Sequence, residues 1–194
     1  FQEMQLVSIE LHKVYRQTDD HFIRILDHIR NNTAQTADLA TLNKRVGAVL
    51  STRGNDLAIT LATRRDTVDY INEQQLGKLE SLPSIFYGSI KGEFPETSLP
   101  SPMELQVKPG AQVIFIKNDK DRRWVNGTLG IIDMIDEENG MISVITEDGN
   151  EYDVEREVWE NLKYTFNEKE QKIEEQQLGT YTQFPIRLAW AITV

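Results

Sequence analysis

Three dipeptides in which glycine follows asparagine or aspartate constrain the fold of this sequence more than any other feature. They are Asn126-Gly127, Asn139-Gly140 and Asp148-Gly149. Such pairs favour the tight turns of β-hairpins, because glycine and asparagine tolerate positive φ. Short apolar runs that read as strands lie around them, over 111–116, 128–135, 141–146, 151–154 and 162–166. Short strands joined by tight turns predict a small β-barrel.

The N-terminal part of the chain has a different hydrophobic pattern, in which apolar residues recur at helical spacing between short strand-like runs. The expected elements are a strand over 6–11, a helix capped by Thr18 or Asp19, a helix from about Thr36, a buried strand over 57–62 and a helix from about Arg65. This order of strand, helices, strand and helix is typical of an α/β layer fold.

A change of composition and hydrophobic pattern after Pro83 suggests where the two parts are joined. The stretch 94–102 is rich in proline and serine and predicts a loop. Residues 173–182 are expected to return the chain to the first domain, where 188–194 would add a core element. Periodicity alone leaves open whether that element is a strand or a helix. We therefore expect an α/β domain of residues 1–82 and 183–194, interrupted by an insertion of residues 83–182.

Both ends of the sequence are unusual. The chain begins with Phe1, and the apolar run 188–194 stops without a polar tail. A free carboxylate on a core element is costly to bury. We interpret both ends as cuts in a larger protein, which would leave this piece without a complete active site.

Composition excludes several kinds of site. The chain has no cysteine, so disulfides, thiolate catalysis and cysteine-ligated zinc are absent. Its net charge of −10 has the wrong sign for a nucleic-acid binder. Binding would need a local basic path, since screening confines the acidic field to about 10 Å; solubility is the simpler role for the charge. No apolar run or leader favours a membrane partner or secretion, so we expect a cytoplasmic protein.

Classical ligand patterns are missing from the sequence. There is no GxxxxGK[ST] loop to cradle phosphates. His12, His21 and His28 lack the spacing of metal ligands and are expected to be solvated. We therefore expect no metal site.

The segment Val14–Gln17 lies between the first expected strand and a capped helix. Loops in this position often carry functional residues. Arg16 could reach a phosphate on a neighbouring domain, as an arginine finger does. The alternative is a surface arginine that pairs with Asp19 or Asp20.

The segment 63–65 lies where a strand ends and a helix begins. Backbone N–H groups and the helix dipole favour an anion there, and Arg64 and Arg65 add positive charge. A nucleic-acid phosphate would suit this site. The alternative is helix capping by Thr63, with both arginines exposed.

The loop 117–128 places several cations beside an aromatic ring. Stacking of bases on aromatic rings next to cations grips single strands without sequence preference. Asp119 and Asp121 dilute this charge. In the alternative, Trp124 plugs the end of the barrel and Asn126-Gly127 only forms a turn. The candidate DNA-binding residues of the loop are Lys117, Asn118, Arg123, Trp124, Asn126 and Thr128.

Four segments, in order, resemble the motifs of one family of motors. They are 11–17, similar to helicase motif IV; 59–64 with 71–73, similar to the next motif; 110–118 with 125–130, similar to the start of an inserted barrel; and 183–194, similar to the front half of motif V. The ordered set resembles superfamily 1 DNA helicases of the 5′-to-3′ class, in the petite-integration-frequency and RecD/TraA-like branch.

The resemblance implies a partial second RecA-like lobe, of the P-loop NTPase type, with an inserted small β-barrel of the Src-homology-3 type. Arg16 would be the catalytic finger, with Gln17 also at the ATP. Thr63 would hold a DNA phosphate, and Arg64 stands where the family commonly has asparagine.

The same resemblance implies the partners and cofactors. ATP and Mg²⁺ would bind the whole motor, and this piece alone would need no cofactor and hydrolyse no ATP. Single-stranded DNA and the first RecA-like lobe would be its partners, and an exposed sheet edge could give a non-physiological dimer. The alternative function is a protein-interaction module whose barrel docks a peptide.

Overall fold

The computed structural model describes residues 9, 18–48, 57–168 and 170–193 of the chain. The strand expected over 6–11 lies outside them, apart from Ile9, and so do Arg16 and Gln17. The chain divides into two compact units, residues 1–51 and 52–194, which are described separately. No helix in the described ranges is long and apolar enough to cross a membrane.

The first unit contains helix α1, Asp20–Arg30. Its N-cap is Asp19, whose Oδ1 accepts hydrogen bonds from the backbone N–H groups of His21 and Phe22 at 2.8 and 3.0 Å. These bonds hold the pKa of the Asp19 carboxyl below its usual value. Of the two expected caps, the structure therefore uses Asp19.

Helix α2, Thr36–Asn43, begins near the expected residue. The side chains of Gln35 and Asp38 form a reciprocal capping box at its start. The Asp38 carboxylate also contacts His28 Nδ1 at 2.9 Å. The histidine, expected to be solvated, is half-buried in this contact and joins the two helices.

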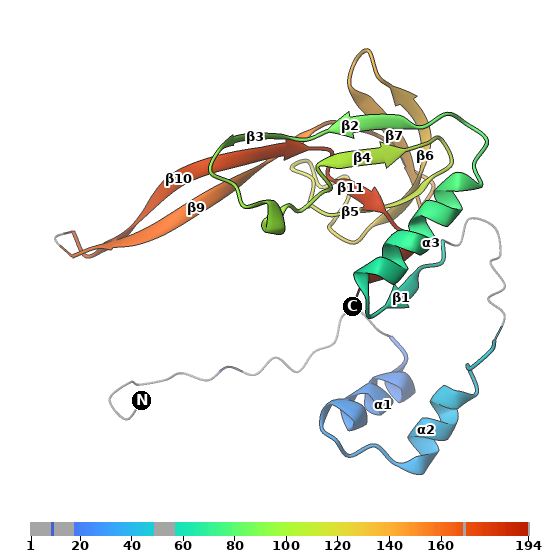
Figure 1. Cartoon of the computed structure of the whole chain (residues 1–194). Helices are drawn as coiled ribbons and strands as arrows, with labels where there is room; N and C mark the ends of the chain where they lie inside the picture. The colour runs from blue at the N-terminus through green and yellow to red at the C-terminus, as the bar shows by residue number, and fades with distance from the viewer. Residues whose placement is uncertain (1–8, 10–17, 49–56, 169, 194) are drawn as a thin grey trace. The chain divides into compact units, whose positions relative to one another are not determined.

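The α/β part of the second unit consists of β1 (Thr60–Ala62), α3 (Arg65–Gly77) and β12 (Ala191–Thr193) (Figure 1). The expected helix is confirmed, and the element left open near the end of the sequence is a strand. It pairs with β1 in parallel, Thr60 opposite Ala191. The burial expected for 57–62 is wrong, because β12 is the one paired neighbour among the described strands and Leu61 stays 62% exposed.

Two buried amides hold these segments together. Asn72 in α3 donates to Ala191 O at 3.0 Å and accepts from Ala191 N at 2.9 Å. Gln112 donates from Nε2 to Ala58 O at 2.9 Å and to Ala189 O at 2.8 Å. Both side chains thereby satisfy backbone groups of segments far away in the sequence, and both are less than 9% exposed.

An antiparallel sheet with strand order β11-β5-β6-β7-β8 forms the largest β region. Its strands are β5 (Gln112–Phe115), β6 (Leu129–Asp136), β7 (Met141–Thr146), β8 (Glu151–Val154) and β11 (Ile186–Leu188). Gly140 and Gly149 take positive φ at the turns that the dipeptides predicted. Within the described residues no pairing joins β8 to β11, so the sheet is open and the expected closed barrel is not confirmed.

Three short strands flank the loop that was predicted over 94–102. They are β2 (Ser84–Tyr87), β3 (Ser89–Gly92) and β4 (Glu104–Val107), and β2 pairs with β4. Between β3 and β4, the proline- and serine-rich stretch holds the single 3-10 turn η1 (Glu96–Ser98). The loop was therefore correctly placed, but its flanking strands are too short to dominate the pattern.

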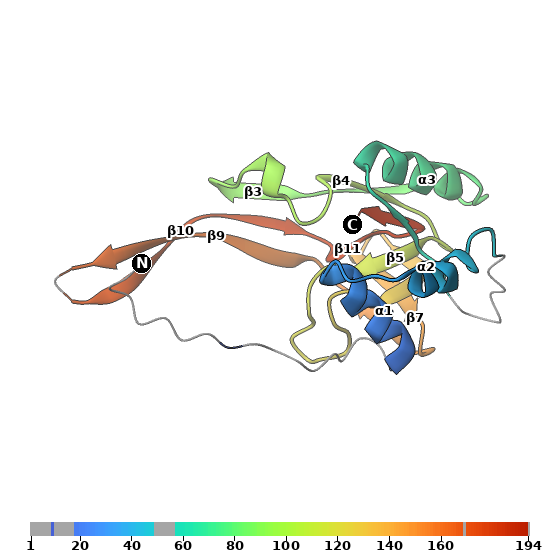
Figure 2. The ribbon, with the colours of Figure 1, turned by 90° about the horizontal axis from the view of Figure 1, so that it is seen from below.

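A long antiparallel hairpin extends from the sheets (Figures 1 and 2). It is formed by β9 (Glu157–Asn167) and β10 (Lys172–Gln183), and β3 pairs with the inner part of β10. Gly179 is required at this crossing, because a Cβ there would come within 2.5 Å of Glu93 N. The strand expected over 162–166 covers only the outer half of β9, and β10 lies in the segment that was expected to return the chain to the α/β domain.

One hydrophobic core connects α3 to the sheets of the second unit. Leu76 of α3 belongs to it, and Phe86 meets Phe184 edge to face at 4.8 Å between ring centroids. The side chains that the structure buries completely at its centre include Val107, Val113, Phe115, Ile142, Val144 and Ile186. The helix and the inserted β region therefore share one packed interior.

The Asn72 bridge gives a first prediction. Asn72→Ala leaves the N–H and C=O of buried Ala191 without partners, and we expect a loss of about 3 kcal/mol in unfolding free energy. Urea titration followed by circular dichroism measures it. The matched control is Glu73→Ala, an exposed neighbour on the same helix. Equal effects of the two substitutions would contradict the bridge.

Candidate nucleic-acid interface

The junction between β1 and α3 carries the first set of predicted residues. Thr63 follows β1 and is exposed, and Arg64 occupies the N-cap position without a side-chain capping bond. The alternative in which Thr63 caps the helix is therefore wrong. The Arg64 guanidinium instead binds Asp66 through two hydrogen bonds, with 3.1 Å between Nε and Oδ1. This contact lowers the pKa of the Asp66 carboxyl.

Arg65, one residue on, is exposed and forms no ion pair with any described residue. It begins α3, where backbone N–H groups and the helix dipole favour anions. The structure therefore makes Arg65 the more available cation of this junction. Arg64 would first have to release Asp66.

The loop between β5 and β6 is tightly braced by three predicted residues. Asn118 Oδ1 accepts from the Asn126 backbone N–H at 2.7 Å. Thr128 Oγ1 accepts from the Val125 N–H at 3.2 Å. Gly127 takes φ of 97° and donates to Phe115 O at 2.8 Å. In this geometry Asn118, Asn126 and Thr128 stabilise the turn. This agrees with the alternative in which Asn126-Gly127 only forms a turn.

Arg123 is paired within the same loop. Its Nη2 and Nε lie 2.7 and 3.0 Å from the Asp119 carboxylate oxygens. The Arg123 hydrogen bond lowers the pKa of Asp119 to about 2, and the carboxylate raises that of Arg123. Asp119 is therefore ionised across the physiological range and neutralises much of the Arg123 charge.

Trp124 lies in the core, only 6% exposed. Phe115 stacks on its ring at 4.4 Å, and the Arg123 guanidinium lies 4.5 Å from the ring centroid. A base therefore finds no free face of this ring in the observed conformation. The burial favours the alternative weighed for Trp124, that it plugs the end of the sheet. Its Nε1–H is buried without a hydrogen-bond partner among the described residues.

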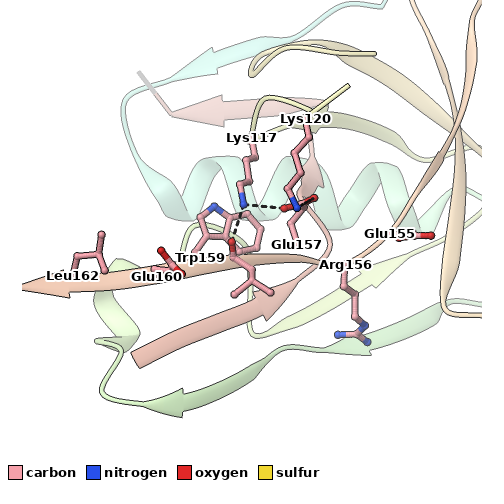
Figure 3. A pocket seen from close by; sticks show the side chains of 9 residues that line it. Lys117, Lys120, Glu155, Arg156, Glu157, Trp159, Glu160 and Leu162 are labelled. Atoms are coloured by element: carbon pink, nitrogen blue, oxygen red, sulfur yellow. Dashed lines mark hydrogen bonds and ion pairs between the residues drawn. The ribbon is translucent and has the colours of Figure 1, made fainter. Parts of the chain in front are cut away.

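A hollow of about 570 Å³ lies beside this loop, at the base of the hairpin (Figure 3). Lys117 donates to Glu157 Oε2 at 2.9 Å and to Val158 O at 2.7 Å, and its Nζ lies 5.2 Å from the Trp159 ring centroid. Lys120 is 81% exposed and only 3.9 Å from the same glutamate. Figure 3 shows both lysines reaching Glu157 next to Trp159.

Sequence reasoning missed Trp159 and Arg122. Trp159 is half-buried and stacks on Tyr181 at 5.8 Å, across the hairpin. No local pattern could reveal it, because its neighbours come from segments distant in sequence. Arg122 is exposed, takes φ of 59°, and forms no ion pair with the described residues. It belongs to the basic loop 117–128 but was not among the predicted DNA-binding residues.

The fold and the site define a class before any relative is considered. A parallel strand pair with a covering helix encloses a β insertion, and exposed cations lie at the strand–helix junction and on the insertion. This combination is an α/β layer with an inserted β region, and its exposed cations suit phosphate groups.

Comparison with known proteins finds DNA helicases as relatives of this chain. No protein-family model matches the sequence. The chain is 28% identical over 184 residues to the ATP-dependent DNA helicase Pif1 of Bdellovibrio bacteriovorus, covering 92% of this chain and 39% of that protein.

Solved structures agree. The Bacteroides sp. Pif1 complex with ADP-AlF4 matches with a TM-score of 0.78 at 32% identity, over 93% of this chain and 41% of that one. Bacteroides Pif1 bound to ssDNA matches with a TM-score of 0.63 at 33% identity, over 95% and 42%. The chain has the fold of these helicases and is similar to them in sequence over nearly its whole length. It spans about two fifths of the length of its relatives.

The Asp119–Arg123 pair predicts a pH dependence. The pKa of Asp119 is depressed in the folded state, so the pair contributes to stability above about pH 4. This contribution is lost as the pH falls through about 2. We expect Asp119→Asn to lower the unfolding free energy at pH 7 by about 1–2 kcal/mol, because solvent reaches Arg123 and screens the pair. Urea titrations from pH 7 to pH 2 measure the difference between the two proteins. A difference that does not shrink below pH 4 would refute the pair's role.

Proposed function

We propose that the chain is part of the second RecA-like lobe of an ATP-driven helicase that translocates 5′ to 3′ on single-stranded DNA. The observation that carries this proposal is the match to Bacteroides Pif1 over 93% of the chain, which combines fold and sequence identity. Relatives of this chain have been solved with ADP-AlF4 and with ssDNA, which supports both ligands for the whole motor.

In this proposal the chain has two structural parts. Residues 1–82 and 183–194 belong to the lobe, and residues 83–182 form the insertion. Its strands β5 to β8 would form most of a small barrel of the Src-homology-3 type, with β11 of the returning segment paired to β5. The return of the chain to β1 through β12 supports this division. The packed interior shared by α3 and the sheet would pass small movements between the two parts.

The catalytic role proposed for this chain rests on Arg16, with Gln17 beside it. An arginine supplied across the cleft stabilises the charge that develops on the γ-phosphate during transfer, and it is effective because its guanidinium binds phosphate oxygens in pairs. The first lobe, ATP and Mg²⁺ complete such a site. The assignment comes from the resemblance of residues 11–17 to motif IV.

The proposed DNA path combines the junction at the start of α3 with the loop 117–128. Thr63, Arg65 and Arg122 would contact phosphates, because each is exposed. Arg64 and Arg123 would join after exchanging their carboxylate partners for phosphate oxygens. In the motor, ATP would close the two lobes, and alternating grips on phosphates would advance the strand.

Binding of single-stranded DNA tests this path. We expect the chain to bind oligothymidine weakly, with the logarithm of the binding constant falling linearly with the logarithm of salt concentration. Arg122→Ala and Arg123→Ala should each weaken binding. Each should also reduce the magnitude of the slope of log K against log salt by up to about 0.7, which is the contribution of one phosphate contact on a single strand. Fluorescence anisotropy at several salt concentrations measures both.

The matched control for these variants is Arg24→Ala, an exposed arginine on α1. It should leave the affinity unchanged. Salt-independent binding, or equal losses from the control and from both loop variants, would rule out the proposed path.

An ATP hydrolysis assay tests whether this chain needs the first lobe for activity. These 194 residues contain no GxxxxGK[ST] loop, so we expect no phosphate release from ATP and Mg²⁺ by this chain, with or without oligothymidine. A coupled phosphate assay measures it, with Arg16→Ala as the matched control. ATP hydrolysis that persists when the wild-type chain is purified, and that is lost in Arg16→Ala, would show a complete site and contradict the proposal.

A further inference from the structure

The hairpin carries a continuous apolar stripe on one face. Leu162, Tyr164 and Phe166 alternate along β9 and therefore share a face, and Phe166 lies opposite Ile173 on β10. The side chains of Tyr164, Phe166 and Ile173 are 60%, 59% and 69% exposed. These four residues are called the hairpin stripe below.

The edge of the hairpin is also unpaired. In the sheet β3-β10-β9, the described part of β9 has a hydrogen-bonded neighbour on one side only. Lys117 contacts the backbone oxygen of Val158 near the base of the strand. Over 159–166 no described strand pairs with this edge. An unpaired strand edge offers backbone donors and acceptors to an added strand. Three of the four stripe residues and the open edge thus lie on the same eleven-residue strand.

The charge of the hairpin selects the kind of partner. Residues 157–183 contain six glutamates and three lysines, a net charge of −3. Glu160 and Glu175 lie on the same face as the stripe, because Glu160 is two residues from Leu162 and Glu175 lies opposite Tyr164. This surface repels nucleic-acid phosphates, and it would also repel a second copy of itself. It attracts a polypeptide with basic side chains.

We propose that β9 accepts an extended polypeptide segment as an added strand, with apolar side chains against the hairpin stripe and basic side chains near the glutamates. Main-chain hydrogen bonds give affinity in this mode of binding, and alternate side chains give specificity. The surface is separate from the residues proposed to bind DNA, so it serves partner recruitment and does not depend on the helicase assignment.

A synthetic peptide of the repeat Leu-Thr-Lys-Thr is the direct probe, because as a strand it places leucine and lysine on one face. The matching repeat Leu-Thr-Glu-Thr is its control. We expect the chain to bind the lysine peptide and not the glutamate peptide. The double variant Tyr164→Thr/Phe166→Thr should weaken binding at least tenfold, since threonine keeps strand propensity while removing the rings. Thr165→Ser, on the opposite face of the same strand, should bind like the wild type. Circular dichroism verifies that each variant is folded.

Four results would overturn the proposal. The lysine peptide could fail to bind the wild-type chain, or could bind the folded double variant equally well. Sedimentation could show that the stripe joins two copies of the chain, in a dimer that the double variant abolishes and the peptide does not disrupt. Oligothymidine affinity could fall tenfold in the double variant, which would assign the stripe to the DNA path instead.

Discussion

The parallel pairing of β1 with β12 is the interaction on which the rest of the structure depends. It joins segments more than a hundred residues apart, and it is held by Asn72, which satisfies both backbone groups of Ala191. Because β12 returns to β1, the region between them emerges from the α/β part and comes back to it. Gln112 strengthens this closure from the inserted side by binding Ala58 and Ala189. The position of every proposed DNA contact in the second unit follows from this closure.

The pairing of cations with nearby carboxylates explains how an acidic chain can present a path for DNA. Arg64 and Arg123 are held by Asp66 and Asp119, whereas Arg65 and Arg122 are exposed beside them. A phosphate can replace Asp66 at modest cost, because the Arg64–Asp66 pair is exposed and such pairs contribute little. The release of Arg123 costs more, because the Asp119 side chain is only 4% exposed. The hairpin glutamates lie on a separate strand pair. The chain thus divides its surface between a region suited to phosphates and a region suited to a basic polypeptide.

Much of the fold could be predicted from local sequence, because its signals are local. Gly140 and Gly149 mark real hairpin turns, and Asp19 caps the helix that follows it. The hairpin β9–β10 was only partly predicted, since the outer half of β10 is exposed on both faces and lacks the alternation that burial imposes. The state of Trp124 could not be predicted, because its burial depends on Phe115 and Arg123 together. The roles of Arg16 and Gln17 stay predictions from the resemblance.

The most direct test of this account is to map which residues touch DNA. Oligothymidine with a photoreactive base can be crosslinked to the chain at low salt, and the attached peptides identified by mass spectrometry. The account predicts crosslinks concentrated in residues 63–65 and in the loop 117–128, with the hairpin 157–183 almost free of them. Crosslinks that fall mainly on the hairpin, or are spread evenly over the surface, would contradict it.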